Sequence, residues 1–283
     1  MVSGKNYPSR GVLHLGRRMK IMSENYKTID SVKNLTCFLE EINKIQTKED
    51  TVWYRGQCSS DQKLIPSVLR EQIDKNGTTY YYNEQEMMYE FMYRAGQIDN
   101  TVPESKEYAK WLPIMQHYGL PTRLLDWTTA PLVALYFALQ NENTDGAIWC
   151  INPKKLNQRL VGYYIPPIDY RSAKFLVDSA FNTEKDDMCR PHIIACTCIG
   201  AYLRMFTQQA NFTIHSKRLR DLTELEAVKD YMYKIIIPKD IKHEFNQYLR
   251  MMGITEDYIY PDLEHIAGAI KSSESSRCYM KEL

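Results

Sequence analysis

The chain has 283 residues, of which 44% are hydrophobic and 25% charged, and its formal net charge at pH 7 is +1. This is the composition of a globular protein with a sizeable core, long enough for one large domain or two small ones. The small net charge excludes a global attraction to nucleic acid or to an anionic membrane, so such a contact would need a local basic patch.

Cysteine spacing and hydropathy bear on metal binding and location. The 7 cysteines form no paired framework, and the cluster of Cys and His at residues 189–198 lacks the spacing of a zinc site. No signal peptide is visible, and no apolar run approaches the ~20 residues that span a bilayer. We therefore expect free thiols, no metal site, no membrane contact and a cytoplasmic location.

Residues 1–22 carry basic side chains, no acidic one and no hydrophobic period. We expect a flexible basic arm, which either contacts a polyanion such as RNA or is a solvated tail. The alternative is an upstream start that precedes the real one at Met19 or Met22.

Apolar periodicity predicts the elements that follow. Helical spacing predicts helices over residues 32–45, 82–97, 104–118, 131–139, 241–252 and 260–270. Runs of β-prone residues predict strands over residues 51–54, 147–151, 192–199, 211–215 and 233–237. Residues 153–160 and 222–228 are expected to form short helical segments, and residues 201–209 are ambiguous. We expect Asp30 or Ser31 to cap the first helix. In the last helix the apolar side chains are expected to face inward, namely Leu263, Ile266, Ala267 and Ile270.

The stretch from Met115 to Ala138 has the density of polar groups that is typical of a site. It places six hydrogen-bonding side chains between core residues: Gln116, His117, Arg123, Asp126, Thr128 and Thr129. Gly119-Leu120-Pro121 breaks the preceding helix. Thr128 or Thr129 is expected to cap the apolar helix that begins near Pro131.

A second signal is Arg55-Gly56-Gln57, directly after a short strand. A guanidinium offers a planar fork for phosphate or carboxylate, and a glycine lets a ligand approach the backbone. The alternative is a structural arginine that pairs with an acid such as Asp126.

These motifs resemble the FRG domain, a family named for its (F/Y)-R-G element. The resemblance covers about residues 30–152, and we expect residues 23–283 to form a single FRG-type domain. The matching segments are Trp53-Tyr54-Arg55-Gly56-Gln57, Leu64-x-Pro66-Ser67, QHYGLPTRLLDWT from Gln116 to Thr128, and Ala134-x-x-Phe137-Ala138. A looser continuation is Arg204-x-x-x-Gln208-x-x-x-Phe212, with Ala210 where a glycine is more usual.

The order of elements in this family is similar to that of the ADP-ribosyltransferase fold, in which two antiparallel sheets splay around an NAD cleft. The resemblance therefore implies an α+β fold, with helices around two small, mostly antiparallel sheets that the C-terminal half completes. It also implies NAD as a substrate and no metal.

Carried over by position, the resemblance implies three catalytic elements. The first is Arg55, and the second is Thr128 or Thr129, before a helix with Ala134, Tyr136 and Phe137. The third is Gln208 or Gln209, or else Glu264, because the usual Q-x-E or E-x-E triplet is absent. The residues expected to contact NAD are Arg55, Gly56, Gln116, His117, Arg123, Trp127, Thr129 and Tyr136.

The chemistry assigns these residues roles. Arg55 or Arg123 would bind the pyrophosphate. Thr128 or Gln208 would hold a ribose hydroxyl, and Asp126 or Glu264 would polarise the nucleophile. The rings expected to stack on the ligand are Tyr118, Trp127 and Tyr136.

The expected function is an NAD-dependent ADP-ribosyltransferase-like enzyme that modifies RNA, DNA or protein, as a toxin or phage-defence effector. An antitoxin or chaperone would be its partner. The alternative is a non-catalytic nucleotide- or partner-binding module, in which Arg55, Arg123 and Asp126 form a buried ion-pair network. A nuclease or other hydrolase lacks support, because neither clustered acidic metal ligands nor a Ser/His/Asp motif is present.

Overall fold

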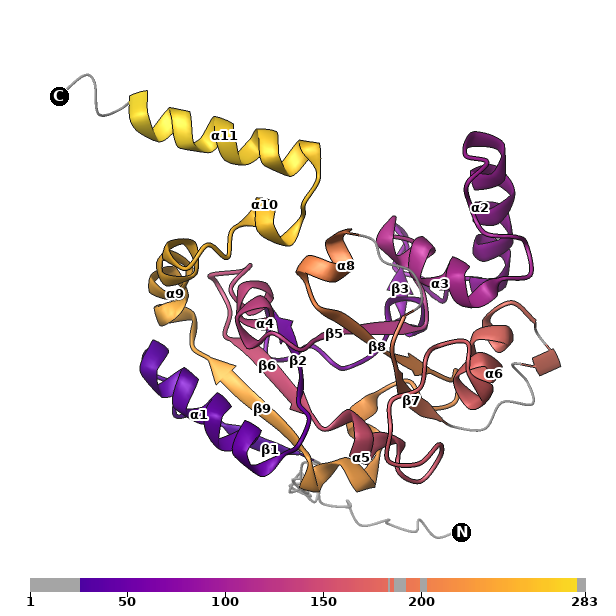
Figure 1. The fold of residues 1–283 in the computed structure, drawn as a ribbon, viewed down its shortest axis with the longest axis horizontal. Coiled ribbons are helices and arrows are strands. Elements are labelled where there is room, and N and C mark those ends of the chain that lie inside the picture. The colour runs from indigo at the N-terminus through magenta and orange to yellow at the C-terminus, as the bar shows by residue number, and fades with distance from the viewer. Residues whose placement is uncertain (1–25, 183, 186–191, 199–202, 279–283) are drawn as a thin grey trace, which may run out of the picture.

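The computed structural model describes residues 26–182, 184–185, 192–198 and 203–278, and it confirms the α+β class (Figure 1). The predicted basic arm at residues 1–22 and Cys189 lie outside the described residues. Within the part of the chain that the structure describes, no helix combines the length and hydrophobicity that crossing a membrane requires.

A seven-stranded sheet in the order β1-β9-β6-β2-β5-β8-β7 forms the centre of the fold. All neighbours are antiparallel except β1 and β9, so the mostly antiparallel arrangement is confirmed. A separate two-stranded sheet joins β3 and β4. The strands are β1 (Lys27–Ile29), β2 (Trp53–Gln57), β3 (Gln72–Ile73), β4 (Thr79–Tyr80), β5 (Leu124–Thr128), β6 (Gly146–Ile151), β7 (Ile193–Cys196), β8 (Ala210–His215) and β9 (Met232–Ile237).

The large sheet opens between β2 and β5. β2 pairs with β6 at five positions, but with β5 at one, where Tyr54 lies opposite Thr128. Beyond that pair, Arg55, Gly56 and Gln57 continue along β6 alone. One sheet therefore consists of two halves, β1-β9-β6-β2 and β5-β8-β7, that are joined at a single residue pair.

Helices pack on each half separately (Figure 1). α1, α4 and α9 share a hydrophobic core with β2, β6 and β9, whereas α2, α3 and α6 share another with β5, β7 and β8. A third cluster contains three of the tryptophans, Trp53, Trp127 and Trp149. The main helices are α1 (Leu35–Lys48), α2 (Glu84–Ile98), α3 (Tyr108–His117), α4 (Pro131–Ala138), α5 (Pro153–Asn157), α6 (Arg171–Ala180), α8 (Leu203–Thr207), α9 (Lys239–Met251), α10 (Glu256–Ile259) and α11 (Leu263–Cys278). Short 3-10 turns occur at Ser67–Leu69, Leu222–Glu224 and Glu226–Asp230.

Both predicted helix caps are wrong. Asn34, and not Asp30 or Ser31, caps α1, because its Oδ1 accepts a hydrogen bond from the Cys37 N–H at 2.9 Å. At α4 the cap position is Ala130, and Thr128 contributes from outside it, with its Oγ1 accepting the Ala130 N–H at 2.9 Å.

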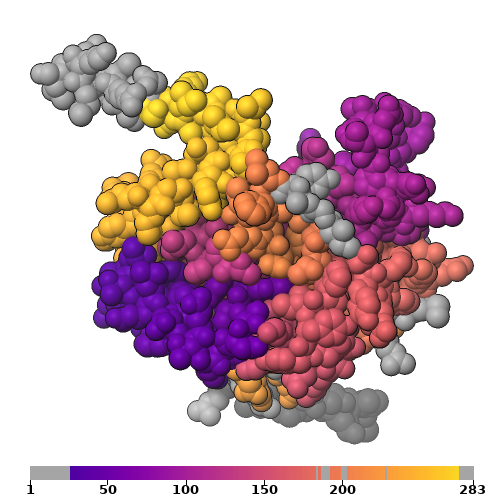
Figure 2. All heavy atoms as spheres, in the orientation of Figure 1, coloured from indigo at the N-terminus to yellow at the C-terminus, as the bar shows by residue number. Residues whose placement is uncertain are grey.

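The inward face predicted for the last helix is also wrong. Leu263 is 85% exposed and Ile270 59% exposed, because α11 extends away from the body of the molecule (Figure 2). Among the described elements, those that the sequence did not predict are β1, β3, β4, β5, α6 and α10. The predicted helical segment at residues 222–228 consists of 3-10 turns.

Candidate functional site

The opening between β2 and β5 contains a cavity of about 230 Å³. One wall comes from the two diverging strands and the others from the end of α3, from α4 and from α8. The lining residues are Tyr54, Arg55, Gly56, Pro113, Gln116, His117, Asp126, Trp127, Thr128, Val133, Phe137, Arg204, Met205, Gln208, Ala210 and Phe212. The cavity thus lies where the strand pairing stops.

Arg55 spans the gap between the two strands. Its Nη1 donates to the backbone carbonyl of Asp126 at 2.8 Å, and lies 3.7 Å from the Asp126 carboxylate. The side chain is 17% exposed, and its buried Nε has no hydrogen-bond partner. Burial lowers the pKa of the guanidinium, and Asp126 opposes that shift. A buried donor without a partner is costly, so this cation has hydrogen-bonding capacity to give to a ligand.

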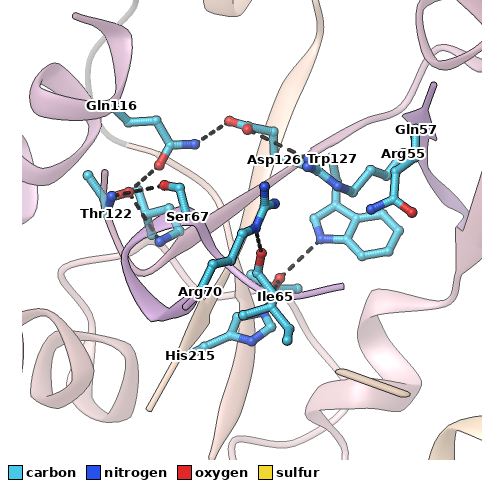
Figure 3. A network of polar contacts seen from close by, with 12 residues as sticks. Arg55, Gln57, Ile65, Ser67, Arg70, Gln116, Thr122, Asp126, Trp127 and His215 are labelled. Atoms are coloured by element: carbon cyan, nitrogen blue, oxygen red, sulfur yellow. Dashed lines mark hydrogen bonds and ion pairs between the residues drawn. The ribbon is translucent and has the colours of Figure 1, made fainter. Parts of the chain in front are cut away.

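The polar residues at the end of α3 hold the Asp126 carboxylate in place (Figure 3). The Gln116 amide nitrogen donates to Asp126 Oδ1, and its amide oxygen accepts from the Thr122 hydroxyl. The Thr122 N–H in turn donates to Ser67 Oγ at 3.3 Å. Both ends of the Gln116 amide are therefore committed to protein partners. The Asp126 carboxylate, 58% exposed, remains open to a ligand at the edge of the cavity.

Three further polar side chains line the cavity, two of them from the segment around α8. Gln208 Nε2 donates to the Ile259 carbonyl at 3.1 Å. Among the described residues no hydrogen bond reaches its amide oxygen, so that oxygen is available to accept from a ligand hydroxyl. The Arg204 guanidinium lies 4.5 Å from the centroid of the Tyr260 ring, a cation–π contact that holds it in position. Burial, followed by the charge of Arg204, lowers the pKa of His117, so its imidazole is neutral at pH 7.

The back wall is a chain of hydrogen bonds that runs away from the cavity (Figure 3). Trp127 Nε1 donates to Thr213 Oγ1 at 3.1 Å, and Thr213 Oγ1 lies 2.9 Å from His215 Nε2. His215 Nδ1 lies 2.9 Å from the Arg220 carbonyl. A carbonyl only accepts, so Nδ1 carries the proton and Nε2 accepts from the threonine hydroxyl. Burial lowers the pKa of His215 to about 3, so this chain keeps one fixed set of donors at neutral pH.

Most of the predicted site residues converge on this cavity. Arg55, Thr128 and Gln208 line it together, although they come from β2, β5 and the end of α8. The other predicted residues that line it are Gly56, Gln116, His117 and Trp127. The Trp127 ring is 2% exposed and its N–H is bonded, so it forms a wall and offers no free stacking face.

Arg123 does not reach the cavity. Its side chain is completely buried against α2 and α6, where Nε donates to Glu84 Oε1 at 2.9 Å and Nη1 to Ser179 Oγ at 2.6 Å. The network predicted for Arg55, Arg123 and Asp126 is therefore two separate ion pairs, Arg55 with Asp126 and Arg123 with Glu84.

Three other predicted residues lie outside the lining. Tyr136 lies on α4 and is buried in the hydrophobic core, and this burial raises its pKa to about 12. Thr129 is exposed and donates to the amide oxygen of Gln209 at 2.7 Å. Glu264 lies on exposed α11. Of the three alternatives for the third element, the structure places Gln208 in the cavity and Gln209 and Glu264 outside it.

Gly56 is required for packing. A Cβ at this position would lie 1.8 Å from the Ala134 carbonyl oxygen and 2.8 Å from the Ala138 nitrogen, both in the backbone of α4. The absent side chain lets α4 lie directly on β2, which places Val133 and Phe137 at the cavity. The missing side chain of Gly56 therefore makes room for the backbone of α4. The sequence alone had predicted that it makes room for a ligand.

Phe137, named with the second element, lines the cavity, whereas Arg204 and Met205 were not singled out as site residues although both line it. Arg204 lies in the looser motif that contains Gln208, and its spacing of four from Gln208 was the available signal.

Comparison with known proteins supports one assignment. Residues 50–147 match the family model of the FRG domain. No match was found among curated proteins or among solved structures. The matched segment contains β2, β5 and α4, which form the open junction of the sheet.

Proposed function

From the premise that residues 50–147 are an FRG domain, we propose that this chain is an NAD-dependent ADP-ribosyltransferase-like enzyme that modifies a macromolecule. The observation that carries the proposal is the meeting of Arg55, Thr128 and Gln208 at one cavity. They come from segments up to about 150 positions apart, and each has the side-chain chemistry that the reaction needs. FRG-domain architecture alone would not assign an activity.

The reaction breaks the bond between nicotinamide and the ribose C1′, and a nucleophile of the acceptor forms the new bond to C1′. Nicotinamide leaves as a neutral molecule, and the nucleophile releases one proton. Because the leaving group is already good, the protein must mainly orient the sugar, stabilise charge and admit the acceptor. A site of this kind needs donors and acceptors at fixed positions, and needs no metal.

The side chains at the cavity fit these tasks. Arg55 and Arg204 supply two cations for the pyrophosphate. The Gln208 amide oxygen accepts from a ribose hydroxyl, and Thr128 stands at the strand junction as a second partner. Asp126, fixed by Gln116, accepts the proton that the nucleophile releases.

The cavity volume limits how much of the dinucleotide lies inside. At about 230 Å³ it is smaller than the ~300–1,000 Å³ of typical small-molecule sites. We therefore assign it to the nicotinamide–ribose half, with the remainder of NAD lying along the open edge between β2 and β5.

A toxin or phage-defence effector that acts in the cytoplasm is the role we propose for such an activity. An antitoxin or chaperone partner would hold it in check. The second candidate function is a non-catalytic nucleotide- or partner-binding module. The contacts of Arg55 with Asp126 favour it, because they give the arginine a structural task as well.

Labelled NAD distinguishes these functions. Folded protein is incubated with NAD carrying label in its adenylate half, together with separated RNA, DNA and protein fractions, and free nicotinamide is measured in parallel. The enzyme transfers label to one fraction and releases nicotinamide in equal amount. The binding module retains NAD without either product.

Gln208→Ala removes the proposed ribose contact, and we expect it to abolish transfer with little change in melting temperature. Gln247→Ala, at an exposed position on α9, is the matched control and should keep wild-type activity. If folded wild-type protein neither transferred label nor consumed NAD, the proposal that this chain is an enzyme would be refuted.

A further inference from the structure

A second hollow of about 610 Å³ lies beside the 3-10 turn at Ser67–Leu69, of which Leu69 lines it. Five of its lining residues are basic and two are acidic, so it is a local positive site on a chain of net charge +1. The basic residues are Lys63, Arg70, Lys217, Arg218 and Arg220, and the acidic ones are Glu71 and Glu224. The cavity between β2 and β5 does not use any of them.

The walls of this basic hollow are held by backbone contacts. The Leu222 N–H donates to the Leu64 carbonyl at 3.3 Å, which joins the two loops that carry most of the basic residues. Arg70 Nε donates to the Ile65 carbonyl at 2.8 Å, and Arg220 Nε to the Lys217 carbonyl at 3.2 Å. The charges are therefore presented on a largely fixed framework, which lowers the entropy cost of binding a ligand.

An aromatic ring is part of the same wall. The Arg220 guanidinium lies 4.5 Å from the centroid of Tyr81, and the Tyr81 hydroxyl donates to Glu71 at 2.6 Å. Tyr81 is 44% exposed, and the neighbouring Tyr80 is 43% exposed. Guanidinium groups beside exposed rings are the combination that binds phosphates and stacks bases along a single strand.

The basic hollow adjoins the proposed NAD cavity. Arg70 lines the hollow, and Figure 3 shows its guanidinium directed toward Asp126, which lines the cavity. The hydrogen-bond chain from Trp127 through Thr213 and His215 ends at the Arg220 backbone, so one rigid element supports both sites. A strand lying in the hollow would therefore pass close to the cavity.

We propose that the basic hollow binds the sugar–phosphate backbone of a single-stranded nucleic acid. A folded acidic protein would also meet positive charge here, but it would not need the exposed Tyr81 ring beside Arg220. That the bound strand is also the acceptor of ADP-ribose rests on the proposed function. The binding itself does not depend on it.

Binding of a labelled oligonucleotide tests this proposal on the full chain, with NAD absent. Fluorescence anisotropy is measured with single-stranded RNA, and with DNA of the same sequence, of about 12 nucleotides. Titrations cover salt concentrations from about 50 to 200 mM, because each phosphate contact contributes to the salt dependence. Affinity for RNA and DNA alike identifies the shared phosphate-and-base chemistry, and a preference for one identifies the natural strand.

The test variant is Lys217→Ala with Arg218→Ala, both exposed on the loop after β8. The control is Arg94→Ala with Lys110→Ala, two exposed cations on α2 and α3 that remove the same charge. Losing two phosphate contacts should reduce the slope of log affinity against log salt by about 1.4. This corresponds to about 25-fold weaker binding at 0.1 M salt, if both proteins bind alike at 1 M.

The control variant should bind as the wild type does, and both variants should keep the wild-type melting temperature. Equal weakening by the two variants would show a general charge effect and overturn the proposal. So would wild-type protein that does not bind either strand, or a phosphorylated acidic peptide that binds with the same dependence on Lys217 and Arg218. Because the assay contains no NAD, an absence of oligonucleotide binding would not contradict the proposed transferase reaction. In the same way, an absence of transferase activity would not contradict the binding result.

Discussion

Gly56→Ala is the sharpest test of how the glycine of the Arg55-Gly56-Gln57 motif acts. The new Cβ would lie 1.8 Å from the Ala134 carbonyl oxygen, whereas ordinary contact begins at 3.4 Å. The two backbones must therefore separate by about 1.6 Å, since the opposing atom is part of α4 and not the end of a flexible side chain. Gly56 has no positive φ, so steric contact alone determines the effect.

The expected loss follows from what α4 buries. Val133, Ala134, Leu135 and Ala138 are each at most 2% exposed, and they lie in the core shared with β2 and β6. Overpacking a core usually costs 1–3 kcal/mol, and here rigid backbone faces rigid backbone, so we expect about 3 kcal/mol or more. For a chain of this length that corresponds to a fall in melting temperature of roughly 6 °C or more.

Urea denaturation followed by circular dichroism measures this loss. Gly96→Ala is the control, because Gly96 lies within α2 with open space around its Cβ position. There alanine should stabilise the protein by roughly 0.5–1 kcal/mol. If Gly56→Ala changed the free energy of unfolding by less than about 0.5 kcal/mol, the packing account of this glycine would be refuted.

Two further predictions concern the buried polar groups Glu84 and His215. Glu84→Gln should destabilise the protein by about 3–5 kcal/mol in urea denaturation, because it leaves the Arg123 charge buried without its partner. Glu90→Gln, which breaks an exposed pair, should cost less than about 0.5 kcal/mol, and a similar cost for both would contradict the distinction. Below pH 6.5 the unfolded chain binds a proton at His215 that the native state does not bind. The contribution of His215 should therefore lower the free energy of unfolding by about 1.2 kcal/mol from pH 6 to pH 5. His215→Gln should remove that part of the slope and exposed His243→Gln should keep it, as pH-dependent urea denaturation will show.

The sequence predicted β2, β6, β7, β8 and β9 from their β-prone side chains, but among the strands that it missed is β5, which forms part of the site. Leu124-Leu125-Asp126-Trp127-Thr128 shows no alternation, because its side chains on both faces are buried except at Asp126. Its identity as a strand is set by pairing with β8, more than eighty positions later. Local periodicity carries no information about such a partner.

The sequence also did not show which of the two arginines is buried in the core and which reaches the cavity. Arg55 and Arg123 both occur in polar motifs with apolar neighbours. Only the fold shows that Glu84, from α2, neutralises Arg123 in the core while Arg55 reaches the cavity. In α11 the apolar spacing was real, but a stripe of apolar side chains does not specify whether anything packs against it.

No local sequence pattern predicted that the site residues would meet. That prediction came from the order of the motifs along the chain, which resembles the order of elements in the ADP-ribosyltransferase fold. Arg55, Thr128 and Gln208 were chosen from the family resemblance, and the structure brings all three to one cavity. Tyr136, chosen in the same way, is buried in the hydrophobic core that α4 covers. Neighbouring positions on a helix face in different directions, so Phe137, named with Tyr136, reaches the cavity while Tyr136 lies in the core.

Crystals of the protein soaked in NAD test the central claim most directly. The account predicts density for the nicotinamide–ribose half between β2 and β5, with a ribose hydroxyl at the Gln208 amide oxygen and a phosphate at Arg55 or Arg204. Clear density for NAD at another place, or an empty cavity at saturating NAD, would contradict it.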